Sequence, residues 1–494
     1  MDPDLYYKLI PSPTFWTGLT IDYDTILFES SVQSLLDLCL DKLVSNELHI
    51  RCIYRRVPPK FHFLLLKKAF IEGRFLSIIP LLIHYPEQYF DIPIPNSLRN
   101  WSVFLSNSDN NYSLMKPVVS FIPAVIRAFF TNSNSKLRIL DMSQVFIPTV
   151  LLSDFLSLLQ EDSFQISSPN QTYTLKVRFI SVFEGDRKIL CDIKRVLLKN
   201  KNINIEVIGL HIFSLSNEEP FLELFHAMDK EELLHFSLEL SKLIDIARFI
   251  PELQLFRNLQ TLNLAYFQNG IALDSNYSTI LACALNSFIH LKQLSLRACC
   301  LSNLLRKLLK HNCDQIYTCT KSNNCLINCC VVHRGKLEYL DVSSCKLKND
   351  DFLVLKEFSF ASSLKYLNLG HNYCDVTRLA ELIEKIGSSL VVLVIEKCLG
   401  PDVQLKPLFS KFEHLFKLKS LNMKEMQISV EDVTALLKAL EKMPELRQIA
   451  LSKTDVFSDF SGKFEKLKCK NHLQVVWSQA KHNTRRPYVL RAQE

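Results

Sequence analysis

Glycine is scarce in this chain, with only 10 copies among 494 residues. Loops that cradle phosphate groups use several closely spaced glycines, because their backbone must approach the ligand closely. The chain has no such loop, and it also lacks the G-x-S-x-G motif of serine hydrolases and the H-E-x-x-H motif of zinc proteases. We therefore expect no enzyme activity, no catalytic residues and no cofactor.

Long apolar runs and strong charge are missing as well. No stretch approaches the roughly 18 apolar residues that are needed to cross a bilayer. The start, Met1–Leu5, has no basic-then-apolar leader. The net charge of +7 is mild for this length, and no stripe of Lys and Arg is interleaved with aromatic residues. We expect neither a membrane nor a nucleic acid as partner, and a cytoplasmic, possibly nuclear, location.

What the chain does contain is one leucine pattern that recurs along its length. The clearest copy is Leu364, Leu367, Leu369 and Asn372, which fits the L-x-x-L-x-L-x-x-N/C signature of a leucine-rich repeat. In this signature the leucines pack inward from a short strand, and the Asn or Cys hydrogen-bonds backbone at the corner. Further copies begin at Leu259, Leu291, Leu337, Leu390, Leu418 and Leu446. Such units stack, because none of them can bury its apolar face alone.

The spacing of the repeats leaves room for a helix in each. From Leu337 onward the copies begin 26 to 28 residues apart, and the ranges 376–386 and 430–440 carry apolar residues at helical spacing. The sequence therefore predicts an α/β fold, a leucine-rich repeat solenoid with strands on the concave side, helices on the convex side and an N-terminal helical region. The expected parts are an extension (1–27), a helical region and solenoid cap (28–130), degenerate repeats (131–255), regular repeats (256–460) and a basic C-terminal tail (461–494). The stretches 137–142 and 203–212 resemble degenerate copies.

The fifteen cysteines are expected to be thiols in such a compartment. Cys299, Cys345 and Cys398 fill the Asn/Cys place of their repeats. Five of the other twelve lie in a Cys-rich insertion at about 311–335, which also carries His311 and His333. Its cysteines are not spaced as paired C-x-x-C knuckles, so we expect a flexible insertion with no metal, and a zinc site is the alternative.

The strand alternation predicts which side chains form the concave surface. Because Leu294 and Leu296 point inward, their neighbours point to the opposite face. The residues predicted to bind a partner there are Arg297, Tyr339, Asp341, Tyr366, Asn368, Glu396 and Lys424. We expect the two tyrosines to be exposed and to act as interface anchors for a protein that the sequence does not identify. The alternative is that this face merely displays soluble residues.

An amphipathic helix is predicted ahead of the repeats. Leu35, Cys39 and Leu43 recur at i, i+4 and i+8, and Ser34 is placed to cap the helix. A small apolar cysteine in the middle of this stripe suits a tight groove in a partner. Shortly downstream, Val57, Pro58 and Phe61 lead into an apolar helix, since proline favours a helix start.

These residues resemble a known family. Ser34, Leu35, Cys39 and Leu43 look like the BC-box, the helix by which substrate receptors hold elongins B and C. Val57 and Pro58 look like the hydrophobic-Pro element of a cullin box. Together with the repeats, their order resembles the PRAME and leucine-rich repeat-containing protein 14 family from about residue 28 to 480, although leucine is usual where this chain has Val57, and the Cys-rich insertion is a departure.

The resemblance implies that the chain is a substrate receptor of a cullin-two RING ubiquitin ligase, with elongins B and C and a cullin as partners. Some family members are implied to repress transcription or inflammatory kinase signalling. A second hypothesis is therefore a repeat-based inhibitor or corepressor that binds a signalling kinase or transcription factor without a ligase, with the N-terminal helices serving only as a cap. A third, an F-box-type adaptor contact, is disfavoured by the Cys39 stripe.

Overall fold

The computed structural model describes residues 35–45, 50, 56–71, 74–83, 85–91, 136–148, 173–181, 203–213, 219–239, 246–265, 275–310, 337–357, 363–400, 403–453, 460, 462 and 473–479. The chain divides into two compact units, residues 1–237 and 238–494. None of the described helices is both long enough and apolar enough to span a membrane.

Three helices open the described part of the first unit: α4 (Leu35–Ser45), α6 (Pro59–Ile71) and α7 (Phe75–Ile83). The helix predicted from the Leu35 stripe is thus present as α4. It is tied to α6 by an ion pair of 2.6 Å between Asp41 and Lys68, and to α7 by the Ser77 hydroxyl, which donates to the Val44 carbonyl at 3.1 Å. The helices therefore form one packed group.

Parallel strands follow the helices in the first unit. They are β1 (Tyr89–Asp91), β2 (Ile139–Pro148), β3 (Tyr173–Ser181) and β4 (Ile203–Phe213), hydrogen-bonded in sequence order. The helix α12 (Glu219–Ala227) comes next, and β5 (His235–Glu239) lies at the boundary between the units. The sequence anticipated β2 and β4 as degenerate repeats but missed β1 and β3. Both of these contribute buried rings, Phe90 and Tyr173.

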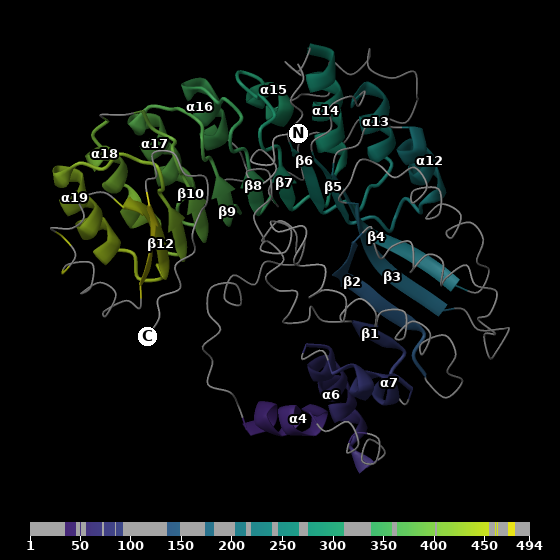
Figure 1. Cartoon of the computed structure of the whole chain (residues 1–494). Coiled ribbons are helices and arrows are strands. Elements are labelled where there is room, and N and C mark those ends of the chain that lie inside the picture. The colour runs from purple at the N-terminus through teal and green to yellow at the C-terminus, as the bar shows by residue number, and fades with distance from the viewer. Residues whose placement is uncertain are drawn as a thin grey trace. The chain divides into compact units, whose positions relative to one another are not determined.

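The second unit alternates short strands with helices (Figure 1). Its elements are α13 (Ile246–Leu253), β6 (Thr261–Ala265), α14 (Ser275–Ser287), β7 (Gln293–Ser295), α15 (Leu305–Lys310), β8 (Tyr339–Asp341), α16 (Asn349–Glu357), β9 (Tyr366–Asn368), α17 (Val376–Ile386), β10 (Val392–Val394), α18 (Lys406–Phe409), the 3-10 helix η6 (Phe412–His414), β11 (Ser420–Asn422), α19 (Val430–Glu441), β12 (Gln448–Lys453) and β13 (Gln474–Gln479). The helices predicted at 376–386 and 430–440 are present as α17 and α19.

The strands of the second unit are parallel and in register, so that equivalent leucines form a column. Leu294, Leu340, Leu367, Leu393, Leu421 and Ile449 occupy one level, and all of them are buried. Within this unit the strands line the inner side of a curve and the helices lie outside it (Figure 1). The predicted fold, an α/β leucine-rich repeat solenoid, is confirmed.

The corners of four repeats also have the predicted bonds. The buried Asn372 side chain donates to the carbonyls of Val342 and Leu369, both at 2.8 Å, and accepts from the backbone of Cys345 and Leu347 at 3.0 Å. Thiols replace the amide in three other repeats. The donors are Cys299, Cys345 and Cys398, whose thiols donate to the carbonyls of Leu264, Leu296 and Leu369 at 2.9, 2.9 and 3.0 Å. Burial raises the pKa of Cys345 and Cys398 well above the usual thiol value, so both act as neutral donors.

Two regions of the second unit that the sequence singled out are the C-terminal tail and the Cys-rich insertion. Strand β13 pairs with β12 over six residues, although the sequence assigned this range to a basic tail. The prediction of a tail from 461 is therefore wrong for β13, because strand pairing with a distant segment is not visible in local charge. The Cys-rich insertion at 311–335, and with it the zinc alternative, lies outside the described residues.

Candidate functional site

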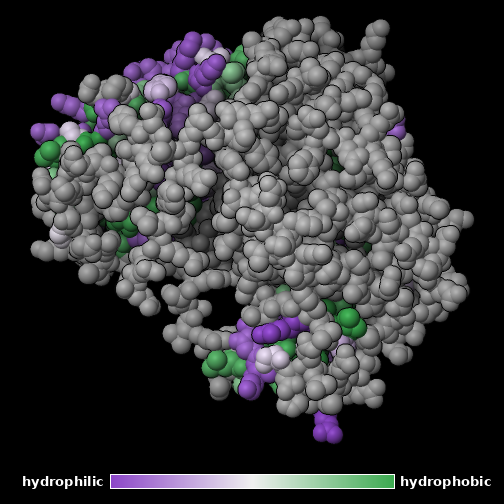
Figure 2. All heavy atoms as spheres, viewed as in Figure 1, coloured by the Kyte–Doolittle hydropathy of each residue, from purple (hydrophilic) through white to green (hydrophobic). Residues whose placement is uncertain are grey.

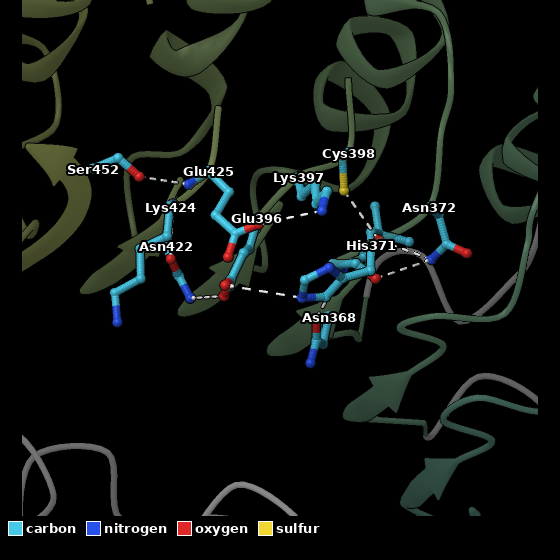
Figure 3. Close-up of polar contacts among 12 residues, drawn as sticks. Asn368, His371, Asn372, Glu396, Lys397, Cys398, Asn422, Lys424, Glu425 and Ser452 are labelled. Carbon is cyan, nitrogen blue, oxygen red and sulfur yellow. Dashed lines mark hydrogen bonds and ion pairs between the residues drawn. The ribbon is translucent and has the colours of Figure 1, made fainter. Parts of the chain in front are cut away.

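The candidate binding surface of the second unit is the concave wall, which we define as the third, fifth and seventh residues of the repeats that begin at Leu291, Leu337, Leu364, Leu390, Leu418 and Leu446. These side chains point away from the leucine column, because side chains alternate along a strand. Figure 3 shows the part of the wall around Glu396 and Asn422. Its polar groups form hydrogen bonds and ion pairs from one repeat to the next.

The two tyrosines of the concave wall do not stand free. The rings of Tyr339 and Tyr366 stack with centroids 4.1 Å apart and an interplanar angle of 9°, and the two residues are only 1% and 4% exposed. The prediction that they are exposed anchors is wrong. The register pairs Tyr339 with Tyr366, so each ring covers the face of the other.

Asp341 is likewise buried rather than exposed, at 4%. Its carboxylate accepts from the Ser343 hydroxyl at 2.6 Å, from the Ser343 backbone at 2.9 Å and from the Asn368 amide at 3.0 Å. Three donors satisfy the charge, so burial costs little. Asn368 is half-buried and its own oxygen accepts from the Gly370 backbone at 3.0 Å. The predicted exposure of Asp341 is therefore also wrong, and its role is to tie neighbouring strands together.

The remaining predicted residues are accessible. Arg297, Glu396 and Lys424 are half-buried. Glu396 accepts from the Asn422 amide at 3.0 Å and lies 3.9 Å from the ring of His371. In Figure 3 the Lys424 chain extends away from this pair. Glu396 and Lys424 thus occupy the same place of adjacent repeats, while the roles assigned to these residues and to Arg297 stay predictions.

The second candidate surface is on the first unit, on helix α4. Ser34 lies outside the described residues, and Leu35 is the first residue of the helix. Cys39 is exposed and Leu43 is half-buried, whereas the residues that follow each of them, Leu40 and Val44, are buried. A helix turns about 100° per residue, so the predicted stripe and the packed face are about 100° apart. Figure 2 shows hydrophobic side chains at the surface in the region of α4.

The predicted cullin-binding residues lie at the start of α6. Pro58 is exposed, and Val57 and Phe61 are half-buried. The helix begins at Pro59, as the proline signal predicted, and the Phe61 backbone donates to the Pro58 carbonyl at 2.9 Å. The ring of His62 lies 3.0 Å from the Val57 carbonyl and holds the turn in place. The structure brings these three residues together in one turn.

Sequence reasoning missed several residues that shape the concave wall. Lys419 and Arg447 precede strands β11 and β12 and lie side by side, since the neighbouring residues Ser420 and Gln448 are paired. His371 and Lys397 fill the eighth place of their repeats and reach carboxylates of the next repeat, Glu396 and Glu425. The repeat pattern could have indicated these residues, because the second and eighth places of each repeat flank the inner strand. No group of three or more potential metal ligands occurs among the described residues.

Comparisons with known proteins add little. No family model and no curated protein matches this chain. Among solved structures it is similar to the crystal structure of the leucine-rich repeat-containing protein LegL7 from Legionella pneumophila, with 15% identity and a TM-score of 0.35 over 63% of this chain and 94% of that one. Such a likeness carries no argument, so the fold assignment rests on strand register and on the corner bonds described above.

Proposed function

We propose that this chain is a non-enzymatic, protein-binding leucine-rich repeat protein that serves as the substrate-recognition subunit of an elongin/cullin-RING ubiquitin ligase. Helix α4 would hold elongins B and C, and the turn at Val57, Pro58 and Phe61 would contact a cullin. The repeats would hold the protein to be modified. The receptor would then act by proximity, because holding a target raises its effective concentration near the conjugating enzyme.

The observation that carries the proposal is the two-faced packing of α4. Leu40 and Val44 are 6% and 1% exposed, and they anchor the helix to the rest of the first unit. A different face carries Cys39 and Leu43, and Cys39 is exposed although it is a small apolar residue. A helix used only as a cap needs one apolar face, whereas a docking helix needs one face for its own unit and another for the partner.

The rigid setting of α4 also supports a docking role. Asp41 is held by Lys68 at 2.6 Å, and Val44 is held through its carbonyl by Ser77. A helix that is already ordered loses little conformational entropy when a partner binds. The turn at Pro58 leads directly into α6, which packs against α4, so both proposed contacts lie on one small group of helices.

The test is co-purification of the full chain with elongins B and C. The native chain should retain both elongins, and the double variant Leu35→Ser, Cys39→Asp should lose them, because a charge enters the apolar groove of the partner. Leu38→Ser is the matched control, since Leu38 is 50% exposed and outside the stripe. It should retain both elongins. Melting curves of all three proteins check that the fold is unchanged.

A second arm tests the cullin contact separately. With elongins present, Val57→Asp should reduce capture of the cullin and leave elongin binding unchanged, because the two contacts use different helices. A native chain that retains no elongin would overturn the ligase proposal. That result would favour the repeat-based inhibitor or corepressor, which needs no adaptor.

A further inference from the structure

The first and last strands differ in how well their core residues are covered. On β1, Phe90 is 0% exposed, and the rings of Phe63, Phe70 and Tyr85 pack against it with centroids 5.2 to 6.0 Å away. On β13, Val475 is level with Ile449 and continues the leucine column, but it is only half-buried. The six column residues before it are all buried. The core of the second unit is therefore less well covered at β13 than at the preceding strands.

One side of β13 has no neighbouring strand in the described part of the chain. The strand order ends with β13, which pairs with β12 over six residues. The Gln474 backbone N–H donates to the Arg447 carbonyl at 2.7 Å. Because alternate residues of a parallel strand direct their backbone groups to opposite sides, those of Val475, Trp477 and Gln479 point away from β12. We call this side of the strand the β13 edge.

The sequence of β13 does not protect the β13 edge against pairing. Gln474–Gln479 contains no charged residue, no proline and no glycine. Edge strands usually carry a lysine, a proline or a bulge, because an unprotected edge pairs with other chains. Val475 and Val476 are β-branched and Trp477 is aromatic, and both kinds of residue favour strands. The edge therefore suits β-augmentation, in which an extended segment of a partner adds a strand to a sheet.

The charge around β13 in the sequence discriminates between possible occupants of the β13 edge. Residues 463–472 carry four lysines and one glutamate, and residues 480–494 carry one lysine, three arginines and one glutamate. Each flank thus has a net side-chain charge of +3 with His neutral. A second copy of β13 would bring positive flanks together, and residues 480–494 folded back along β13 would meet 463–472. A segment with acidic flanks is attracted instead, because opposite charges steer and orient association.

We propose that the β13 edge binds an extended segment of a partner protein that has β-branched or apolar residues in its centre and acidic residues on both sides. The centre pairs with the outward backbone groups of β13, and its alternate side chains cover Val475 at the end of the core. The acidic residues face the two basic flanks. This inference rests on the proposed function where it identifies the segment as part of the protein to be modified.

The test measures binding of defined peptides to the purified full chain by fluorescence anisotropy. The probe is a labelled peptide with a centre of alternating Thr and Val, as long as β13, and a run of Glu on each side. It should bind about tenfold more tightly than the same peptide with Lys in place of Glu. The difference should shrink as salt rises, because accessible charges are screened.

Backbone N-methylation of the probe separates strand pairing from other modes of binding. N-methyl groups on alternate central residues leave one edge of the peptide able to pair, so this peptide should bind about as well as the probe. N-methyl groups on every central residue block both edges and should weaken binding by about tenfold or more, because the backbone donors of the added strand are lost. The two peptides have the same side chains, so the difference between them reports the backbone alone.

Variants of the chain locate the contact at the β13 edge. Val475→Pro removes an outward N–H and keeps the bonds to β12, since an edge strand tolerates proline where its N–H faces away from the sheet. Binding of the probe should weaken by about fivefold or more. Val475→Ala is the matched control, because it shortens the same side chain but keeps the N–H, and binding should weaken by about twofold or less. Melting curves check that both variants fold, and the N-methylated peptides keep the test valid if Val475→Pro melts early.

Equal binding of the acidic and basic peptides, equal binding of the probe and its fully N-methylated form, or no binding of any peptide would overturn the inference. A native chain that sediments as a dimer, and as a monomer after Val475→Pro, would overturn it too, because the occupant would then be a second copy. Elongin capture is measured on the same variants and should be unchanged. A native chain that binds the probe but captures no elongin would reject the ligase and keep the β13 edge.

Discussion

On the first strand of the first unit a carboxylate lies beside another carboxylate, whereas two carboxylates on the strands of the second unit lie beside amides. Asp91 on β1 is level with Asp141 on β2. On β8 and β10, by contrast, Asp341 and Glu396 each accept from an asparagine of the next repeat at 3.0 Å. Burial and the neighbouring Asp141 raise the pKa of Asp91 to about 6. The difference teaches that the group on the adjacent strand decides how costly a carboxylate on the inner face is. A neighbouring amide stabilises the charged form, whereas a neighbouring carboxylate destabilises it.

The corners differ between the units as well. In the second unit, the three-residue strands β7, β8, β9 and β10 each end in a corner that an Asn or Cys side chain closes. In the first unit β2, β3 and β4 run for 10, 9 and 11 residues, with shifts of register within the pairings of β2 with β3 and β3 with β4. A side chain that satisfies the corner backbone lets the chain leave the sheet early, and the following helix can then begin close to the strand.

The largest effect is expected at the corner amide. Asn372→Ala removes five hydrogen bonds at a residue that is 0% exposed and leaves two buried backbone N–H groups without their acceptor. The free energy of unfolding should fall by about 3 kcal/mol or more, because buried unsatisfied donors each cost about 1 to 3 kcal/mol. Urea unfolding of the full chain, followed by circular dichroism, measures the loss.

Asn372→Cys sharpens the same comparison. The three repeats with a cysteine at this place close the corner with a single thiol donor, so this variant should lose clearly less stability than Asn372→Ala. Tyr373→Ala is the control at the adjacent residue, which is 59% exposed, and it should change stability by less than about 0.5 kcal/mol. If Asn372→Cys and Asn372→Ala were equally unstable, the thiol bonds of the other corners would contribute nothing.

Changes of medium size and opposite sign in the free energy of unfolding are expected for Asp91→Asn and Asp341→Asn. The raised pKa of Asp91 means that the folded state holds its proton more tightly than the unfolded state does, so this residue costs stability as the pH rises from about 4 through 6. Asp91→Asn removes that cost. After allowance for partial exposure, it should stabilise the protein by about 1 kcal/mol at pH 7.5 and have little effect at pH 4.

Asp341→Asn should act in the other direction at pH 7.5. Its carboxylate accepts three hydrogen bonds. The NH₂ group of an asparagine would face some of the same N–H and O–H donors, and the free energy of unfolding should fall by about 1 to 2 kcal/mol. Urea unfolding at the two pH values measures both variants. Two changes of the same sign would contradict the contrast between the units.

How far the sequence predicts this molecule depends on how local each feature is. The leucine column and α17 follow from fixed spacing, which any single repeat reveals, and both are present where expected. The burial of Tyr339 depends on Tyr366, 27 residues later, because two large rings on adjacent strands cover each other. Strand β3 was missed for a related reason. Its alternating residues, Tyr173 to Ser181, indicate a strand only weakly until the partner strands β2 and β4 are known.

The smallest effect on stability is expected from the positive φ angles in the backbone of the repeats. Among the described residues, all eight non-glycine residues with positive φ lie in the second unit, and five of them fill the eighth place of a repeat. These five are Ala298, Ser344, His371, Lys397 and Glu425. The left-handed conformation costs roughly 1 kcal/mol for a residue with a Cβ atom, although the scarcity of glycine in the chain hides this turn from sequence analysis.

Ser344→Gly should therefore stabilise the protein by about 0.5 kcal/mol, because the relieved strain slightly exceeds the added entropy of the unfolded chain. Ser344→Val should destabilise it by about 1 kcal/mol or more, since a β-branched residue fits φ of 57° poorly. Ser388→Gly is the matched control at an exposed serine without positive φ, where only the entropy cost remains and stability should fall by a few tenths of a kcal/mol. Melting temperatures of the three variants give the order directly, and a loss at Ser344→Gly as large as at Ser388→Gly would mean that the eighth place stores no strain.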